Sequence, residues 1–410
     1  MAQLQSSSIS GSLIVSGSDI TVQGLTVGRG GGDISSNVAV GICTLLSNTT
    51  GIQNTAVGNL ALCSNTAGSR NTAVGNGSMV NNTGGVNNAA FGHISMNRNT
   101  TGIFNAAFGS DVMFCNTTGQ RNAAFGFAAL KFNESGINNT ALGQCALVYN
   151  TVSNNTAVGS NALRSNTTGL RNVAVGYKAL IANTTGCRNT AVGYRTLDSN
   201  TTGTSNTALG SSALINNITG CANTAVGEST LLYNTVGRYN TAIGQLSQFV
   251  QTTADNNTSL GNWTLQCNVV GSGNVAIGKS ALRNNTVANN TAVGCGALQA
   301  NTTGTKNTAL GSRSLFLNTT GINNTALGSR ALCANTTGQG NTAVGNGTLA
   351  YSTVGRYNTA MGSATLSNAT AADNNTALGY ATMQCVTTGG NNTAIGKMAL
   401  RYNITGNNNT

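Results

Sequence analysis

Few side chains in this 410-residue sequence are of the types that carry out acid–base catalysis: one histidine, His93, and eight carboxylates. Such catalysis requires two groups held within hydrogen-bond reach of each other. The acids instead occupy different slots of different repeats, so we expect them to be solvated surface groups. We therefore predict no catalytic residue in this chain and no enzyme activity. The acids concerned include Asp111, Glu134, Asp198 and Glu228.

Ten cysteines could in principle form disulfides or bind a metal. A metal site requires ligands that converge at a fixed spacing, and no C-x-x-C motif is present. The cysteines fall at five different repeat positions, as at Cys43, Cys63, Cys115, Cys187 and Cys295. We expect free thiols, no metal site and no cofactor.

A short repeat defines the slots that these residues occupy. The phrase NTAVG returns along the chain from Asn37 to Asn409 in steps of 17 residues. Two steps, Asn139 to Asn155 and Asn274 to Asn290, are 16 residues long, and the series contains 22 units. A block of seven units is itself duplicated, because YNTVGRYNTAIG at 233–244 matches YSTVGRYNTAMG 118 residues later.

The consensus of the units is N-T-A-V-G-x-x-A-L-x-x-N-T-T-G-x-x. Position 1 is always Asn and position 5 always Gly, while position 4 is always apolar. Position 3 is Ala except at Ser259, and position 9 is Leu or Met except at Gln248. A 17-residue unit with so few apolar residues cannot bury a face alone, so neighbouring units must stack.

The repeat predicts an all-β fold, a parallel β-solenoid or β-roll of about 22 coils of 17 residues. Gly, Asn and Thr at fixed places in every unit disfavour helix. We expect short strands at positions 2 to 5 and 7 to 10, and a turn at NTTG in which Gly supplies the positive φ. Like positions then stack on like positions at about 4.8 Å.

Stacking suggests a structural role for each conserved slot. Position 1 is expected to form a ladder of Asn side chains. Apolar residues at positions 4 and 9 fill a narrow interior, Ala stays small at positions 3 and 8, and Gly at position 5 allows a close turn. In the first full units these residues are Asn54, Ala56, Val57, Gly58, Leu62, Asn71, Val74 and Gly75.

The alternation of a strand also predicts self-association. Thr55 and Val57 share one side of the strand, while Ala56 and Gly58 share the other. A smooth Ala/Gly strip along the stack would suit close approach of another chain, so we expect a homo-oligomer, most simply a trimer.

Three segments are predicted. Residues 1–36 form a β-rich cap or attachment segment, residues 37–408 the solenoid shaft, and residues 409–410 the start of a further unit. Because solenoids need caps, we expect either that the chain continues or that another subunit stacks end to end there.

The sequence resembles a known class of fibres. The passage ITVQGLTVGRGGGDISSNVAVG at 20–41, followed by NTAVGxxALxxNTTGxx repeats, is similar to the shaft region of bacteriophage tail-fibre proteins. More weakly, the units resemble the head repeats of trimeric autotransporter adhesins. The resemblance implies a trimeric, elongated, host-contacting structural protein of the virion. The alternative is an extracellular or cell-surface filament or adhesin.

Charge and hydropathy limit the partners. The net charge of +11 comes from Arg and Lys mainly in turns, which suggests either a soluble edge or weak attraction to anionic host polysaccharide. Nucleic acid is disfavoured because aromatic platforms are absent and Trp263 is the only tryptophan. No window is apolar enough for a membrane span, and the first residues do not resemble a secretory signal.

Asn-x-Thr sequences recur as formal glycosylation acceptors. They serve either as sugar sites in a secreted protein or as turn and ladder residues, and the second interpretation is favoured because no signal peptide is visible. Stacked threonines also suggest ice binding, but adjacent threonines at positions 13 and 14 diverge and cannot form a flat array. The N-T-T acceptors are Asn48, Asn99, Asn116, Asn166, Asn183, Asn200, Asn301, Asn318 and Asn335.

Overall fold

The computed structural model describes residues 20–22 and 25–410. It divides into two units, the first ending at Asn155 and the second running from Thr156 to Thr410. Among the described residues, helix is limited to the short 3₁₀ segment η1 (Gly31–Asp33). The two units together hold about 21 turns at a spacing of about 17 residues, which confirms an all-β parallel solenoid.

The first unit begins with antiparallel pairing. Strand β2 (Leu25–Gly28) pairs antiparallel with both β1 (Ile20–Val22) and β3 (Val38–Ile42). From β3 onward the pairing within this unit is parallel and in register, so that Ala56 lies opposite Ala73. The following strands are β4 (Thr55–Val57), β5 (Thr72–Val74), β6 (Ala89–Phe91), β7 (Ala106–Phe108), β8 (Ala123–Phe125) and β9 (Thr140–Leu142).

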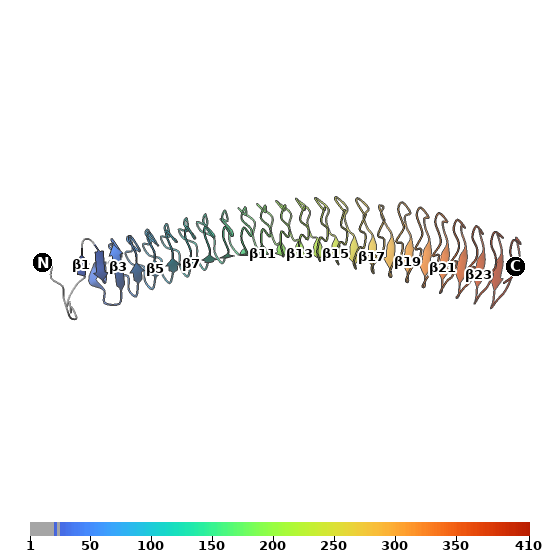
Figure 1. Ribbon diagram of the computed structural model, residues 1–410, viewed down its shortest axis with the longest axis horizontal. Coiled ribbons are helices and arrows are strands. Elements are labelled where there is room, and N and C mark those ends of the chain that lie inside the picture. The colour runs from blue at the N-terminus through green and yellow to red at the C-terminus, as the bar shows by residue number, and fades with distance from the viewer. Residues whose placement is uncertain (1–19, 23–24) are drawn as a thin grey trace. The chain divides into compact units, whose positions relative to one another are not determined.

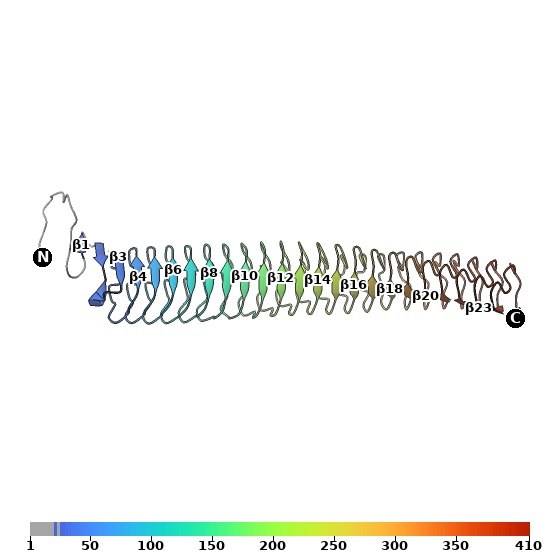
Figure 2. The same cartoon turned by 90° about the horizontal axis from the view of Figure 1, so that it is seen from below.

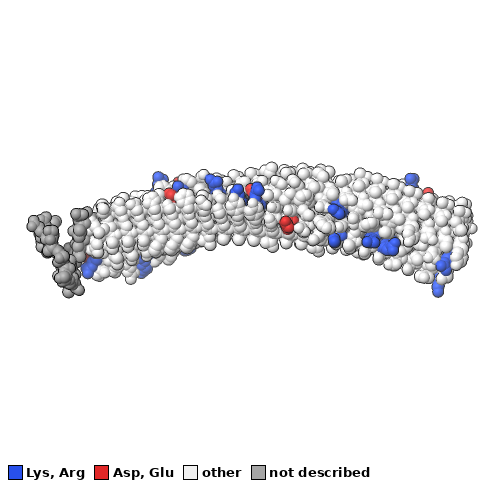
Figure 3. Space-filling view, viewed as in Figure 1, with Lys and Arg blue, Asp and Glu red and all other residues white. Residues whose placement is uncertain are grey.

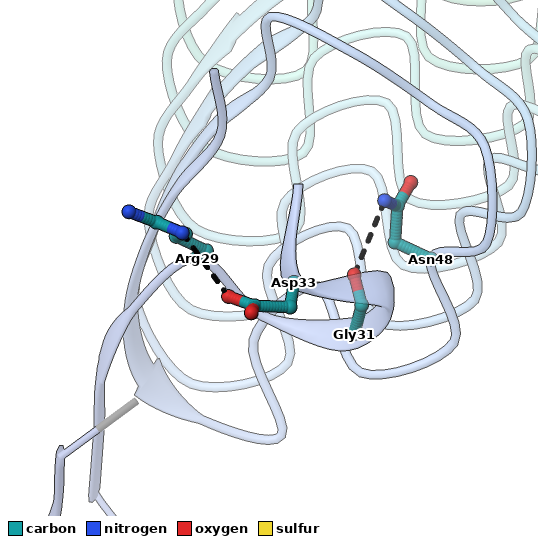
Figure 4. A network of polar contacts seen from close by, with 4 residues as sticks. All are labelled: Arg29, Gly31, Asp33 and Asn48. Carbon is teal, nitrogen blue, oxygen red and sulfur yellow. Dashed lines mark hydrogen bonds and ion pairs between the residues drawn. The ribbon is translucent and has the colours of Figure 1, made fainter. Parts of the chain in front are cut away.

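Segment η1 contacts the first turn of this unit. Gly31 N–H donates to Leu45 O at 2.9 Å, and Asn48 Nδ2 donates to Gly31 O at 3.3 Å (Figure 4). Arg29 and Asp33 form an exposed ion pair of 3.4 Å across the same segment (Figure 4). Residues 25–36 of the predicted cap thus supply hydrogen-bond partners to the edge of the stack. The predicted domain boundaries themselves remain a prediction, and residues 1–19 and 23–24 of the cap lie outside the described residues.

The second unit is a longer series of the same kind, with every strand parallel to the next and in register. Figures 1 and 2 show the turns within each unit side by side, one strand to a turn. Its strands are β10 (Thr156–Val158), β11 (Val173–Val175), β12 (Thr190–Val192), β13 (Thr207–Leu209), β14 (Thr224–Val226), β15 (Thr241–Ile243), β16 (Thr258–Leu260), β17 (Val275–Ile277), β18 (Thr291–Val293), β19 (Thr308–Leu310), β20 (Thr325–Leu327), β21 (Thr342–Val344), β22 (Thr359–Met361), β23 (Thr376–Leu378) and β24 (Thr393–Ile395).

The predicted second strand at positions 7 to 10 is wrong. Leu60 and Leu62, at positions 7 and 9, have φ of 61° and 51°, values outside the extended region that a strand requires. The chain curls here, although Leu62 N–H still donates to Ser78 O of the next turn at 3.1 Å. From β4 onward each turn therefore has one three-residue strand, followed by a tightly curled return at positions 7 to 10.

The prediction that position 4 fills the interior is also wrong. Ala56 at position 3, Ala61 at position 8 and Leu62 at position 9 are fully buried, whereas Val57 at position 4 is half-buried. Because neighbours in a strand point to opposite sides, burial of Ala56 directs Thr55 and Val57 outward. The Ala strip expected to meet another chain is consequently part of the core.

Asparagine at position 1 bonds both within its turn and to the next one. Asn54 Nδ2 donates to Gly68 O at 2.8 Å, and Asn54 Oδ1 accepts from Asn71 N–H at 3.0 Å. Both residues are fully buried. Each side chain thus satisfies backbone groups that water cannot reach, which stabilises the turn.

A second asparagine ladder runs along position 12, as the interpretation of these asparagines as turn and ladder residues predicts. Asn65 Nδ2 donates to Asn48 Oδ1 at 2.8 Å and to Gly68 O at 3.0 Å. Gly68, at position 15, lacks the positive φ predicted for it. Glycine is required there for space, because a Cβ on Gly68 would lie 2.5 Å from Asn82 Nδ2 and 2.5 Å from Gly85 O.

The 16-residue units shorten this same corner. In the unit that begins at Asn274 the glycine is missing, and Val287 O takes over its role as acceptor. Asn274 Nδ2 and Asn285 Nδ2 donate to that carbonyl at 2.8 and 2.6 Å. One residue is lost, and both asparagines keep a backbone carbonyl acceptor within their own turn.

Candidate interaction surface

The outward side chains of the strands form a continuous surface in each unit. We call the side chains at repeat positions 2 and 4 the strand face, which is formed by β4 to β9 in the first unit and by β10 to β24 in the second. Position 2 is most often Thr, and position 4 is Val, Leu, Ile, Phe or Met. Full burial of the small Ala at position 3 fixes this orientation, because neighbouring residues of a strand point to opposite sides.

Large apolar side chains on the strand face are open to solvent. In the second unit Leu209 is 47% exposed, Leu260 46%, Leu310 49% and Met361 47%. Contiguous exposed apolar patches of more than a few hundred Å² usually mark interaction sites. The repeat aligns these side chains in one column, since Leu310 lies opposite Leu327 and Val293 in neighbouring strands.

In the first unit this column contains stacked aromatic rings. Phe91, Phe108 and Phe125 follow one another on β6, β7 and β8 with ring centroids 4.7 Å apart and planes within 7° of parallel. Phe125 is 40% exposed. Stacking satisfies the ring faces, while the ring edges remain available for a partner.

No charged residue occurs at position 2 or 4 in any repeat. Charged residues occupy other repeat positions, for example position 17 at Arg171 and position 6 at Glu228. In the space-filling view of Figure 3, charged side chains are few and separate, and most of the visible face is uncharged. The strand face is therefore uncharged along each unit, with an apolar column at position 4 beside a column at position 2 that is mostly threonine.

The size of the strand face is close to that of a stable interface. The fifteen strands from β10 to β24, spaced about 4.8 Å apart, extend over about 70 Å. With a width of about 10 Å, this unit presents about 700 Å², against about 800 Å² per partner in a standard protein–protein interface.

The acids and the histidine do not converge. His93 and Glu134 are exposed, and Asp111 pairs with Lys131 at 3.4 Å. Arg195 donates to Asp198 at 2.6 Å, and this hydrogen bond raises the pKa of the arginine. Glu228 accepts a hydrogen bond from Gln245 Nε2 at 2.9 Å. The described acids that have a partner thus contact basic, hydroxyl, amide or backbone groups, as Asp255 does in accepting from Arg238 N–H at 2.6 Å.

All ten cysteines lie in the described part of the chain, and each is a free thiol. Burial, with a smaller contribution from Cys43, raises the pKa of Cys63 above its ordinary value, and burial likewise raises the pKa of Cys115. Such thiols are poor nucleophiles at neutral pH because the thiolate is the reactive form. Over residues 20–22 and 25–410, no group of three or more His, Cys, Asp or Glu side chains could hold a metal ion.

Basic residues lie along the turns. Arg171 and Arg188, at position 17 of adjacent turns, line a shallow hollow together with Leu170 and Cys187. Both arginines are exposed. Elsewhere basic side chains cover aromatic rings, as Lys279 and Arg283 do with Trp263 at 5.2 and 5.4 Å. These pairs sit at turn positions and not on the strand face.

The formal glycosylation acceptors at position 12 are buried ladder residues. Asn200, for example, is fully buried and donates to Asn183 Oδ1 at 2.7 Å and to Gly203 O at 3.1 Å. The threonine that follows, Thr201, donates its hydroxyl to Ile218 O at 3.2 Å. A sugar on such an amide would remove ladder hydrogen bonds, so burial argues against modification of the folded chain, although glycosylation itself stays an untested prediction.

No protein-family model matches the chain, and no curated protein matches it either. The part of the chain that the structure describes contains no helix long and apolar enough to cross a membrane. The strand face is thus the site that the geometry itself singles out. The sequence analysis singled out the residues of the strand face but placed position 4 in the core. The absence of charged residues at positions 2 and 4 was the signal in the sequence that marks this face.

Proposed function

We propose that the chain is a structural fibre shaft, most simply the shaft of a phage tail fibre that presents a host-contacting tip. The observation that carries this proposal is the neutral, apolar strand face repeated in every turn around a core that the chain fills by itself. A fibre shaft must be long and stiff. The stacked turns give the length, and a lateral contact with another chain along the strand face stiffens the thin solenoid. The proposal includes no enzyme activity and no cofactor.

The partner proposed for the strand face is another copy of this chain, closed as a homotrimer. A partner that packs against successive position-4 side chains must present groups at the same spacing of about 4.8 Å. An identical solenoid has that spacing, and the missing charges allow two such faces to approach without burying an ion. Cyclic closure of three copies then covers the face of each one.

The trimer is tested by its mass in solution. Light scattering should give three times the 41.2 kDa chain mass. The combined substitution of Leu260, Leu310 and Leu378 by Glu places charges in the strand face and should release monomers. Substitution of the exposed position-6 residues Ser312, Ser329 and Asn346 by Glu adds the same charge elsewhere and should leave the mass unchanged. A monomeric unsubstituted chain, or equal effects of both triple variants, would refute the assignment.

The alternative is an extracellular or cell-surface filament or adhesin built from the same stacked turns. Exposed arginines such as Arg171 and Arg188 support a weak contact with anionic surface polysaccharide in either setting. Electron microscopy of native particles with antibody against the chain separates the two functions. Label on fibres attached to a virion supports the phage shaft, whereas label on free filaments or on a cell envelope supports the alternative.

A further inference from the structure

Two adjacent turns of the second unit carry polar side chains in the core. Gln248 stands at position 9 of the turn 240–256, where the other repeats have Leu or Met. Ser259 stands at position 3 of the turn 257–273, where the other repeats have Ala. Both side chains are fully buried. The single exceptions at positions 3 and 9 thus face each other across one turn-to-turn contact.

The two residues belong to one hydrogen-bonded cluster. Gln248 Nε2 donates to Ser259 Oγ at 2.7 Å and to Thr241 O at 3.2 Å. Ser247 Oγ lies 2.5 Å from Ser259 Oγ and 2.7 Å from Thr264 Oγ1. We call Ser247, Gln248, Ser259 and Thr264 the polar node. It adds side-chain hydrogen bonds to the backbone hydrogen bonds between the two turns, such as that from Gln248 N–H to Thr264 O at 2.9 Å.

The polar node is not optimal for stability. Gln248 Oε1 is buried and has no hydrogen-bond partner among the described residues. In the same turn Gln251 replaces the ladder asparagine, and Asn234 Oδ1 of the preceding turn is buried without a partner as well. Buried polar groups that cost stability are retained in some proteins because they select one arrangement over others.

A stack of similar turns needs such selection. Because the turns resemble one another, any turn could pack on any other. Looping out one intervening turn costs little chain entropy, since the entropic cost of closing a loop grows only slowly with loop length. The block duplication increases the ambiguity, since the residues 118 positions after Gln248 and Ser259 are Leu366 and Ala377, which follow the consensus. The polar node is one of the few core features that distinguish the two blocks.

We infer that the polar node fixes the stacking register near the middle of the second unit, by making the turn 240–256 specific for the turn 257–273. If the turn 257–273 were looped out, Gln248 would face the apolar residues Ala276 and Leu282 of the following turn. If the turn 240–256 were looped out, Ser259 would face Leu231. Either slip leaves a buried amide or hydroxyl without its partner, which strongly disfavours it. This inference does not depend on the proposed fibre function.

The test is hydrogen exchange of the refolded chain, read by mass spectrometry. Gln248→Leu with Ser259→Ala restores the consensus core, so the double variant should fold with an equal or higher denaturation midpoint. Peptides from 257–273 should nevertheless show a protected and an unprotected population. We expect the unprotected fraction to be roughly tenfold larger than in the unsubstituted chain, because a chain with this turn looped out no longer buries unpaired polar groups. One protected population, as in the unsubstituted chain, would overturn the inference.

A transplanted node separates register selection from stability. Ala213→Ser, Leu214→Gln and Ala225→Ser, made in the double variant, rebuild the node two turns earlier, where Thr230 already matches Thr264. The unprotected fraction should fall in 223–239 and remain high in 257–273. If the new polar groups merely weaken the core, 223–239 becomes less protected, and that result contradicts the inference.

Discussion

The inner and outer sides of the same strand follow different rules. In β13, Ala208 points inward and is fully buried, while Thr207 and Leu209 on either side of it are exposed. Across the repeats the inner position is Ala with one exception, whereas the outer position 4 ranges from Val to Phe. A close-packed interior restricts side-chain volume, and an open face does not. Variation in size along the repeat thus marks the side that faces out.

The largest expected effect is a cavity on the inner side. Leu214→Ala removes a fully buried position-9 side chain and should lower the free energy of unfolding by about 2 to 5 kcal/mol. Denaturant unfolding of the monomeric triple variant, with and without this substitution, measures the change. A loss below about 1 kcal/mol would mean that the core is not closely packed.

The next effect concerns the asparagine ladder at position 1. Asn206→Ala leaves Gly220 O and Asn223 N–H without their side-chain partner, so unfolding should become easier by about 1 to 3 kcal/mol. Hydrogen exchange should speed up most at Asn223. The exposed control Ser211→Ala, at position 6 of the same turn, should change the free energy of unfolding by no more than about 0.5 kcal/mol and leave the exchange rate at Asn223 unchanged.

A smaller effect is expected at the curled return. Ala364 has φ of 57°, a region that costs a residue with a Cβ about 1 to 2 kcal/mol. Gly347 occupies the same position 7 in the preceding turn with φ of 62°. Ala364→Gly should therefore stabilise the fold by about 0.5 kcal/mol after the greater flexibility of unfolded glycine is subtracted. A lower midpoint in thermal unfolding would contradict this account.

The smallest effect on folding is expected on the outer side. Leu209→Ser on the strand face, where this side chain is 47% exposed, should change the free energy of unfolding of the monomeric triple variant by less than about 0.5 kcal/mol. Comparison with Leu214→Ala, made on the same background, tests the contrast between the two sides directly. Equal losses would show that position 4 contributes to the core after all.

Much of the fold could be predicted from the repeat alone. A constant interval between Asn54, Asn71 and their successors implies that equivalent residues stack, so the parallel register and the turn-by-turn architecture follow from spacing. The position-1 asparagines were expected in a ladder on the same ground. The position-12 asparagines were likewise favoured as turn and ladder residues over glycosylation sites, but the repeat alone did not show that a residue such as Asn65 is fully buried.

What the sequence by itself determined was the period: one turn per repeat, in register, with like residues over like. Only the tertiary structure decided which side of each strand is inside. Alternation assigns Ala56 and Val57 to opposite sides without ranking them, and hydropathy favoured the larger Val57 for the core. The positive φ at Leu60 and Leu62 curls the return so tightly that the buried leucine fills the interior, and only alanine fits beside it. The more apolar residue is therefore left outside because space, and not hydrophobicity, limits what this narrow core can hold.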